Sequence, residues 1–145
     1  MHKIFGTKED APYWDRPGVY LIPRRGNQVG IIQTPKGYFF IGGGIEPGES
    51  HEACLVRECL EETGWTVRIG VKLCSAETYT THATLGLFHP IQTYYTGSLG
   101  SQVTQPTEPD HTLLWMDYAQ LRGKLFSEMQ NWALEQLLSP TPPFD

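Results

Sequence analysis

Short apolar stretches separated by turn residues predict a sheet in the first third of the chain. Residues 19–22 (VYLI) and 29–33 (VGIIQ) have the composition of strands, and the PRRGN segment between them predicts a hairpin. A third short strand is expected at residues 38–41 (YFFI). The three glycines that follow, residues 42–44, predict a turn that ends this strand.

Residues 51–63 have the periodicity of a helix. Ser50 is a suitable N-cap, Glu52 lies in the first turn, where the helix dipole favours an acid, and Gly64 suits the C-terminal stop. Apolar and small side chains recur at helical spacing and predict the inward face of this helix. They are Ala53, Val56, Cys59, Leu60 and Thr63.

Further strand patterns follow the helix. Residues 65–74 alternate between polar and apolar positions, which predicts a half-buried strand with Val67, Ile69, Val71 and Leu73 on one face. Residues 83–95 supply more strand material. Pro90 within them predicts an edge position or a bulge, because proline cannot donate a hydrogen bond to a neighbouring strand.

The last part of the chain predicts a loop, a strand and a helix. Residues 96–110 are polar and irregular, residues 112–116 predict a strand, and residues 127–138 predict an amphipathic helix. The pattern predicts a mixed α+β fold with helices packed on a sheet. We expect one domain over the whole chain, with residues 1–15 and 139–145 peripheral to it.

Composition narrows the classes of function. The chain has 145 residues and 39% hydrophobic residues, as expected of one globular domain. Its formal net charge of −5 makes it a poor binder of duplex nucleic acid, and no apolar stretch has the length of a signal peptide or membrane span. Cys54, Cys59 and Cys74 are odd in number and lack CxxC spacing, which favours a reducing, cytoplasmic location.

Three glutamates are crowded on the predicted helix. Helical geometry places Glu58, Glu61 and Glu62 on one stripe, roughly opposite the apolar face. Each like-charge pair costs a few tenths of a kcal/mol, so the stripe is either a solvated acidic face or a site with a compensating charge. Clustered carboxylates are the hard oxygen ligands that Mg²⁺ or Mn²⁺ requires, and the preceding glycines let a ligand approach the backbone.

Glycines, glutamates and an arginine form a longer pattern over positions 43–65. Read from Gly43, it is five residues, Glu49, seven residues, and then RECLEETGW. This resembles the signature of the Nudix hydrolase family, G-x5-E-x7-R-E-U-x-E-E-x-G-U, where U is a bulky apolar residue. All seven fixed positions match, for which chance gives below about one in 10^8 per starting position. Cys59 replaces a larger aliphatic, and Ile41 stands where many members carry proline.

The resemblance implies a fold, an activity and a cofactor. The Nudix fold is an α/β/α sandwich with a mixed sheet between helices. The implied activity is hydrolysis of a nucleoside diphosphate linked to another group, with Mg²⁺ or Mn²⁺ as the cofactor and a small-molecule nucleotide as the substrate. The metal ligands implied are Glu58, Glu62, Glu61 and the backbone carbonyl of Gly42.

The resemblance also implies catalytic roles. Glu58 is the candidate general base within the signature, but some family members place the base in a later loop, which here offers Glu108 and Asp110. Arg57 is expected to orient carboxylates, with Glu49 as its partner, or to contact phosphate.

Several alternatives stay open at this point. One is a Nudix-like domain that binds a nucleotide as a sensor without cleaving it. Mutagenic nucleotides, dinucleoside polyphosphates and nucleotide sugars are all compatible with the sequence as substrates. The oligomeric state is open too, a homodimer included.

Overall fold

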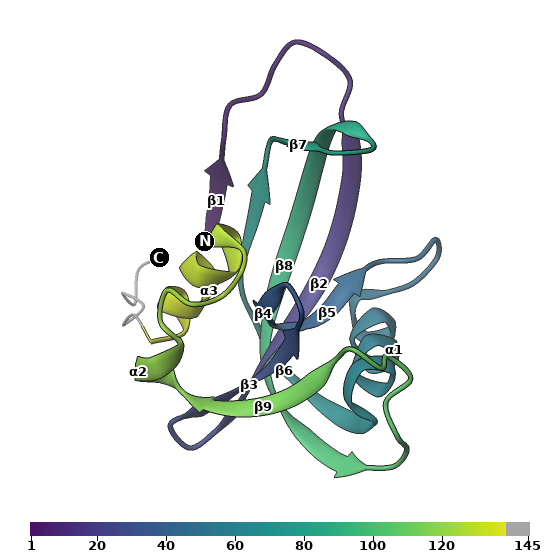
Figure 1. Ribbon diagram of the computed structural model, residues 1–145, viewed down its shortest axis with the longest axis vertical. Coiled ribbons are helices and arrows are strands. Elements are labelled where there is room, and N and C mark those ends of the chain that lie inside the picture. The colour runs from purple at the N-terminus through teal and green to yellow at the C-terminus, as the bar shows by residue number, and fades with distance from the viewer. Residues whose placement is uncertain (139–145) are drawn as a thin grey trace.

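The computed structural model describes residues 1–138 and shows a mixed sheet with helices on both sides (Figure 1). The predicted tail, residues 139–145, lies outside the described residues. The strands are β1 (His2–Phe5), β2 (Trp14–Arg25), β3 (Gln28–Thr34), β4 (Gly37–Phe39), β5 (Ile41–Gly44), β6 (Trp65–Thr78), β7 (Thr80–His82), β8 (Gly86–Gln102) and β9 (Thr112–Asp117). The helices are α1 (His51–Thr63), α2 (Tyr118–Leu121) and α3 (Glu128–Leu138).

The sheet has the order β1-β6-β8-β2-β3-β4, with β5 also paired to β2, β7 to β8 and β9 to β3. Strand β2 lies parallel to β8 and antiparallel to β5, so the sheet is mixed. Residues 2–5, inside the expected peripheral segment, form β1 and pair in parallel with β6. The predicted hairpin is present between β2 and β3, although β2 is much longer than predicted.

Two hydrophobic clusters lie on opposite faces of this sheet. One contains Val19, Leu21 and Ile41 packed with Cys54, Leu55 and Cys59 of α1. The other contains Ile22, Ile31, Phe40 and Tyr94 packed with α2, α3 and the segment between them, through Leu121, Leu125, Met129, Ala133 and Leu134. The predicted α+β sandwich is therefore confirmed. Within residues 1–138, no helix is both long enough and apolar enough to cross a membrane.

The glycine segment is a strand rather than the predicted turn. Gly42, Gly43 and Gly44 belong to β5 and pair with Tyr20, Val19 and Gly18 of β2. The predicted strand at residues 38–41 is instead divided between β4 and β5, which pair with different neighbours. Glycine is required at position 42 of this strand, because a Cβ there would collide with the Val19 carbonyl oxygen of β2. The glycines allow close approach within the sheet as well as turning of the chain.

Helix α1 has the predicted caps. The Ser50 hydroxyl accepts a hydrogen bond from the Ala53 N–H (3.1 Å), and Gly64 takes a left-handed conformation at φ 76°. The predicted inward face is wrong in part, because Ala53 is exposed and Val56 is 45% exposed. The buried residues of α1 are Cys54, Leu55, Cys59, Glu62 and Thr63. The helix therefore turns a glutamate toward the sheet, which an apolar pattern cannot predict.

Two further strand predictions required correction. The alternation predicted through residues 65–74 fails after Ile69, because register shifts in the β6–β8 pair change the phase and leave Val71 69% exposed. Pro90 lies in β8, which is interior between β6 and β2 and not an edge strand. The proline is tolerated there because β8 pairs with β6 up to Ile91 and with β7 from Phe88, which leaves Pro90 between the two ladders.

The segment predicted to be irregular is shorter than expected. Strand β8 continues to Gln102, so the irregular loop comprises residues 103–111. The last strand and the closing helix are present as β9 and α3, and the short helix α2 was not predicted. The loop leads from the end of β8 past the C-terminal end of α1 into β9, which brings it to the acidic residues of the helix.

Candidate active site

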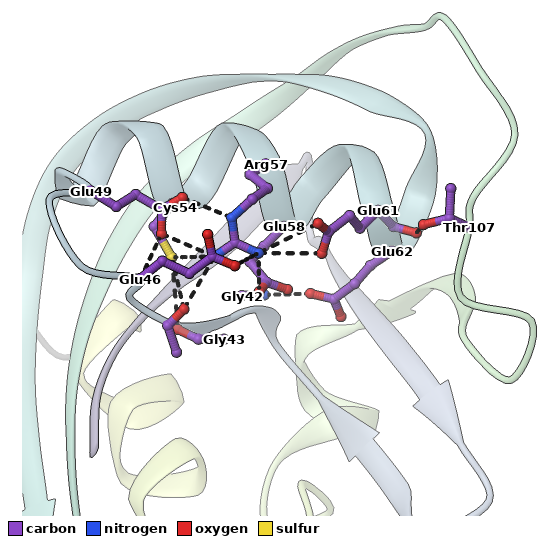
Figure 2. Close-up of polar contacts among 11 residues, drawn as sticks. Gly42, Gly43, Glu46, Glu49, Cys54, Arg57, Glu58, Glu61, Glu62 and Thr107 are labelled. Atoms are coloured by element: carbon purple, nitrogen blue, oxygen red, sulfur yellow. Dashed lines mark hydrogen bonds and ion pairs between the residues drawn. The ribbon is translucent and has the colours of Figure 1, made fainter. Parts of the chain in front are cut away.

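Arg57 is the centre of a polar cluster between α1 and β5 (Figure 2). Its guanidinium forms a two-point ion pair with Glu49, with Nε–Oε2 and Nη2–Oε1 distances of 2.7 and 2.9 Å. Nη1 donates to Glu58 at 2.9 Å and to Glu61 at 3.3 Å, and Nη2 donates to the Gly44 carbonyl at 3.2 Å. One guanidinium therefore fixes three carboxylates and the glycine strand in one arrangement.

The Glu49–Arg57 pair is the firmly ionised part of the cluster. The hydrogen bonds from Arg57 lower the pKa of the Glu49 carboxyl to about 2. The same contacts raise the pKa of the Arg57 guanidinium above its ordinary value. Glu49 also accepts the Glu46 N–H at 3.0 Å, which ties the loop before α1 to the pair.

Glu58 and Glu62 face the sheet, so the prediction that they lie on a stripe opposite the apolar face is wrong. Glu62 is 5% exposed and accepts the Gly42 N–H at 2.9 Å, and the Glu58 side chain is 15% exposed. Burial raises the pKa of both carboxyls, and the charge of Glu58 raises the pKa of Glu62 further. The glutamates are turned inward because Arg57 and the β5 backbone supply partners on the side of the sheet.

Glu61 differs from its two neighbours. Its side chain is 37% exposed, and its Oε2 lies 3.3 Å from Arg57 Nη1, farther than the Glu58 carboxylate does. Its backbone carbonyl accepts N–H groups from Thr107 (2.9 Å) and Glu108 (3.3 Å). Glu61 therefore joins the loop of residues 103–111 to the last turn of α1.

The loop brings the two other predicted acids to the same region. The charge of Glu108 contributes to the raised pKa of Glu62, so the two carboxyls lie within electrostatic range. Asp110 and Glu62 line a common cavity of about 450 Å³, whose walls include Tyr20, Phe39 and Phe40. His111 lines this cavity too, and its Nδ1 is buried without a hydrogen-bond partner among the described residues.

Sequence reasoning missed Cys54 and Tyr20 in this site. The Cys54 thiol lies 3.6 Å from the Gly44 carbonyl oxygen and 3.7 Å from Arg57 Nη2, and burial raises its pKa to about 12. The spacing of Cys54 and Arg57, about one helical turn, could have indicated their contact. Tyr20 borders the cavity through the pairing of β2 with β5, which no local signal in the sequence reveals.

The donor set suits a hard divalent cation. Glu58, Glu61 and Glu62 supply carboxylate oxygens, and like charges held in a buried setting favour a neutralising cation. In residues 1–138, however, no three His, Cys, Asp or Glu side chains surround a point in the manner of bound-metal ligands. Glu58 and Glu61 are bonded to Arg57 instead.

Comparison with known proteins gives one family. The model of the NUDIX domain matches residues 14–136, which include the whole site. No curated protein sequence matches the chain.

Solved structures show the same fold. A NUDIX hydrolase from Nitrosomonas europaea is 19% identical with a TM-score of 0.71, covering 86% of this chain and 88% of its own. A MutT NUDIX hydrolase from Burkholderia pseudomallei is 23% identical with a TM-score of 0.70, covering 86% and 98%. A protein named ADP compounds hydrolase is 20% identical with a TM-score of 0.63, covering 84% and 70%. At these identities the likeness concerns the fold.

In excess chelator, we expect the unfolding free energy to fall as pH rises above the ordinary carboxyl range. The raised pKa of Glu62 means that the folded protein keeps a proton that the unfolded chain has already released. This contribution to stability is complete below the unfolded pKa and is lost as pH rises through the folded pKa. Glu62→Gln can still accept the Gly42 N–H but does not ionise, so its stability should fall less.

Urea denaturation at a series of pH values measures this difference. Glu52→Gln serves as the matched control, because Glu52 is an exposed acid on the same helix. Parallel pH profiles for the wild type and Glu62→Gln would contradict the expectation.

Proposed function

The chain belongs to the NUDIX domain family and is a Nudix-type pyrophosphohydrolase, and from this premise we propose its reaction. It is a divalent-metal-dependent hydrolase that cleaves a diphosphate linkage in nucleoside diphosphate derivatives or nucleoside triphosphates. Water attacks phosphorus, and the substrate is a small-molecule nucleotide. The cell compartment proposed is the reducing cytoplasm, supported by the three buried free cysteines.

The inward-facing pair of Glu58 and Glu62 beside Gly42 carries this proposal. A protein that used α1 only for packing would have no need to place two carboxyls of raised pKa against a strand. The arrangement is costly without a compensating positive charge, since burial penalises the ionised form of each group. Such costs are commonly found where a site is prepared for a ligand.

The residues proposed to hold Mg²⁺ or Mn²⁺ are Glu58, Glu62, Glu61 and the backbone carbonyl of Gly42. When bound, the cation would neutralise the diphosphate oxygens and lower the pKa of the attacking water. The closeness of Glu58 to β5 supports the choice, because a Cβ at Gly43 would lie 2.7 Å from its carboxylate. Glycine at this position leaves the space that the carboxylate occupies.

Arg57 and Glu49 act as positioning residues in this proposal. Arg57 holds Glu58 and Glu61 at fixed distances, and Glu49 fixes the orientation of the guanidinium through two hydrogen bonds. Because the Glu49–Arg57 pair is ionised over the whole physiological pH range, the geometry it imposes does not change with pH.

The general base is proposed to be Glu58, with Glu108 and Asp110 as the alternatives. Glu58 has a raised pKa, which makes it a stronger acceptor of the water proton than an ordinary carboxylate. Glu108 and Asp110 gain support from their position, since the former acts electrostatically on Glu62 and the latter shares its cavity. Their side chains belong to a loop that is hydrogen-bonded to the end of α1 through the carbonyls of Glu61 and the C-cap Gly64.

The second candidate function is a nucleotide sensor that binds without cleaving. The cavity that Glu62 and Asp110 line is compatible with nucleotide binding without cleavage. The complete carboxylate set favours the hydrolase, because a sensor needs neither a general base nor a full set of metal ligands. Turnover with and without Mg²⁺ separates the two functions.

Glu62→Gln should reduce turnover by about two orders of magnitude or more and weaken Mg²⁺ binding, because it removes a charged ligand while keeping the side-chain shape. Steady-state kinetics with Mg²⁺ titration measures both effects, with Glu52→Gln as the control. Full activity of Glu62→Gln, or of the wild type in excess chelator, would disprove the metal-dependent mechanism.

Glu108→Gln and Asp110→Asn should lower turnover if the loop of residues 103–111 contributes the base or substrate contacts. Each substitution removes the negative charge and preserves the side-chain volume. Rates and Michaelis constants for each variant measure the effect. If both variants have the rate and Michaelis constant of the wild type, Glu58 is the base and the loop only connects β8 to β9.

Hydrolysis in oxygen-18 water should place the label in a phosphate-containing product, because the proposed attack is at phosphorus. Mass spectrometry of the separated products measures the position of the label. Label found only in a sugar or acyl product would mean attack at carbon and would refute the proposed reaction.

A further inference from the structure

Arg16 lies next to the candidate active site but outside the signature. It shares a strand face with Gly18 and Tyr20, because side chains two residues apart on β2 point to the same side. Gly18 and Tyr20 are paired with Gly44 and Gly42 of β5. On this face of the sheet, Gly18, Gly42 and Gly44 leave the backbone without side chains between Arg16 and Tyr20. We call these three residues the glycine floor.

The guanidinium of Arg16 lies directly over this floor. A Cβ added to Gly44 would be 3.1 Å from Arg16 Nη2 and 3.4 Å from its Cζ, so the group occupies the space that a side chain at Gly44 would need. Gly44 and Gly42 are two residues apart, which is about 7 Å along a strand. Gly42 is the residue whose N–H binds Glu62, so Arg16 stands about that far along β5 from the position that holds the Glu62 carboxyl.

The environment of Tyr20 supports the same placement. Burial raises the pKa of the Tyr20 hydroxyl to about 12, the charge of Arg16 opposes this rise, and the charges of Glu62 and Glu58 add to it. The hydroxyl is thus within electrostatic range of all three groups. Tyr20 also lines the cavity that Glu62 lines, so the Arg16 guanidinium is close to one wall of that cavity.

Arg16 has no structural role that would explain its position. It is exposed and makes no hydrogen bond, ion pair or ring contact within residues 1–138. Three other arginines are engaged: Arg57 with carboxylates, Arg122 with Glu135 at 2.7 Å, and Arg25 over the Trp115 ring at 4.1 Å. A guanidinium held over bare backbone keeps all its donors available for a ligand.

We propose that Arg16 binds a phosphate group of the substrate, at the end of the glycine floor remote from Gly42. This proposal rests on the proposed function, since it assigns a further substrate contact to the same site. Guanidinium groups bind phosphate through two parallel hydrogen bonds, and the glycine floor lets a phosphate chain run along β5 from the cavity lined by Tyr20 and Glu62 to Arg16. Arg16 would therefore favour substrates with a phosphate chain long enough to span both positions.

Binding measured in chelator tests this contact without turnover. The probes are adenosine, AMP and ADP, titrated into the wild type, Arg16→Gln, Arg16→Lys and Arg24→Gln by NMR or calorimetry. Arg24 is the matched control, because it is an exposed arginine at the other end of β2. Arg16→Gln should bind ADP about tenfold more weakly with adenosine affinity unchanged, Arg16→Lys should fall between, and Arg24→Gln should match the wild type.

Two results would overturn the proposal. One is an equal loss of affinity for adenosine and ADP in Arg16→Gln, and the other is a wild type that binds AMP and ADP no better than adenosine. Thermal unfolding should be unchanged in Arg16→Gln, and Arg16→Lys keeps the charge and provides a second variant if Arg16→Gln unfolds. If Arg16→Gln loses affinity for ADP while the wild type hydrolyses no nucleotide, the Arg16 contact is supported and the hydrolase is refuted. The failure of this proposal and the failure of the proposed function are therefore distinguishable.

Discussion

The contact between helix α1 and strand β5 is the constraint on which the rest of the site depends. Arg57 joins Glu49, Glu58 and Glu61 to the Gly44 carbonyl, and Glu62 accepts the Gly42 N–H. Four acidic side chains can share this small volume because one guanidinium and one backbone N–H compensate part of their charge. Removing either compensating group would leave buried carboxylates without partners, which is more destabilising than the loss of an exposed ion pair.

Backbone geometry makes that contact feasible. At Gly42 a side chain would collide with the β2 backbone, and at Gly43 it would collide with the Glu58 carboxylate. The absence of side chains brings the helix and the sheet close enough for direct hydrogen bonds between them. The Ser50 cap and the Gly64 stop then set the length of α1, so that its acidic residues lie beside β5 and its last turn meets the loop of residues 103–111.

The site combines groups that remain charged with groups whose charge depends on their surroundings. Glu49 and Arg57 stay ionised because each stabilises the other, whereas burial favours the protonated forms of Glu58 and Glu62. A bound cation would reverse this preference, since it stabilises the ionised carboxylates. Burial of these two carboxyls therefore carries an electrostatic cost, and under the proposed function a bound cation would relieve it through the same two side chains.

The sequence by itself determined the α1 boundaries, the β2–β3 hairpin, β9, α3 and the Nudix signature, because caps, turns and spacing are local properties. It also singled out Glu49, Glu58, Glu61 and Glu62, but not Glu46, whose carboxylate lies 3.8 Å from Arg57. Which way those acids point was decided by the tertiary structure. Glu62 is buried and Val56 is exposed because Gly42 offers a hydrogen bond that no helical periodicity encodes.

Long-range pairing likewise decided the features that local patterns missed. The glycines became a strand because β2 passes beside them, the phase of β6 changed at a bulge against β8, and Pro90 became interior because β8 pairs on both sides. Arg16 and Tyr20 reached the site through the same β2–β5 register. Residues distant in sequence acquire a common environment only when the sheet forms, and the hydrogen bonds and charges they then share are properties of the fold.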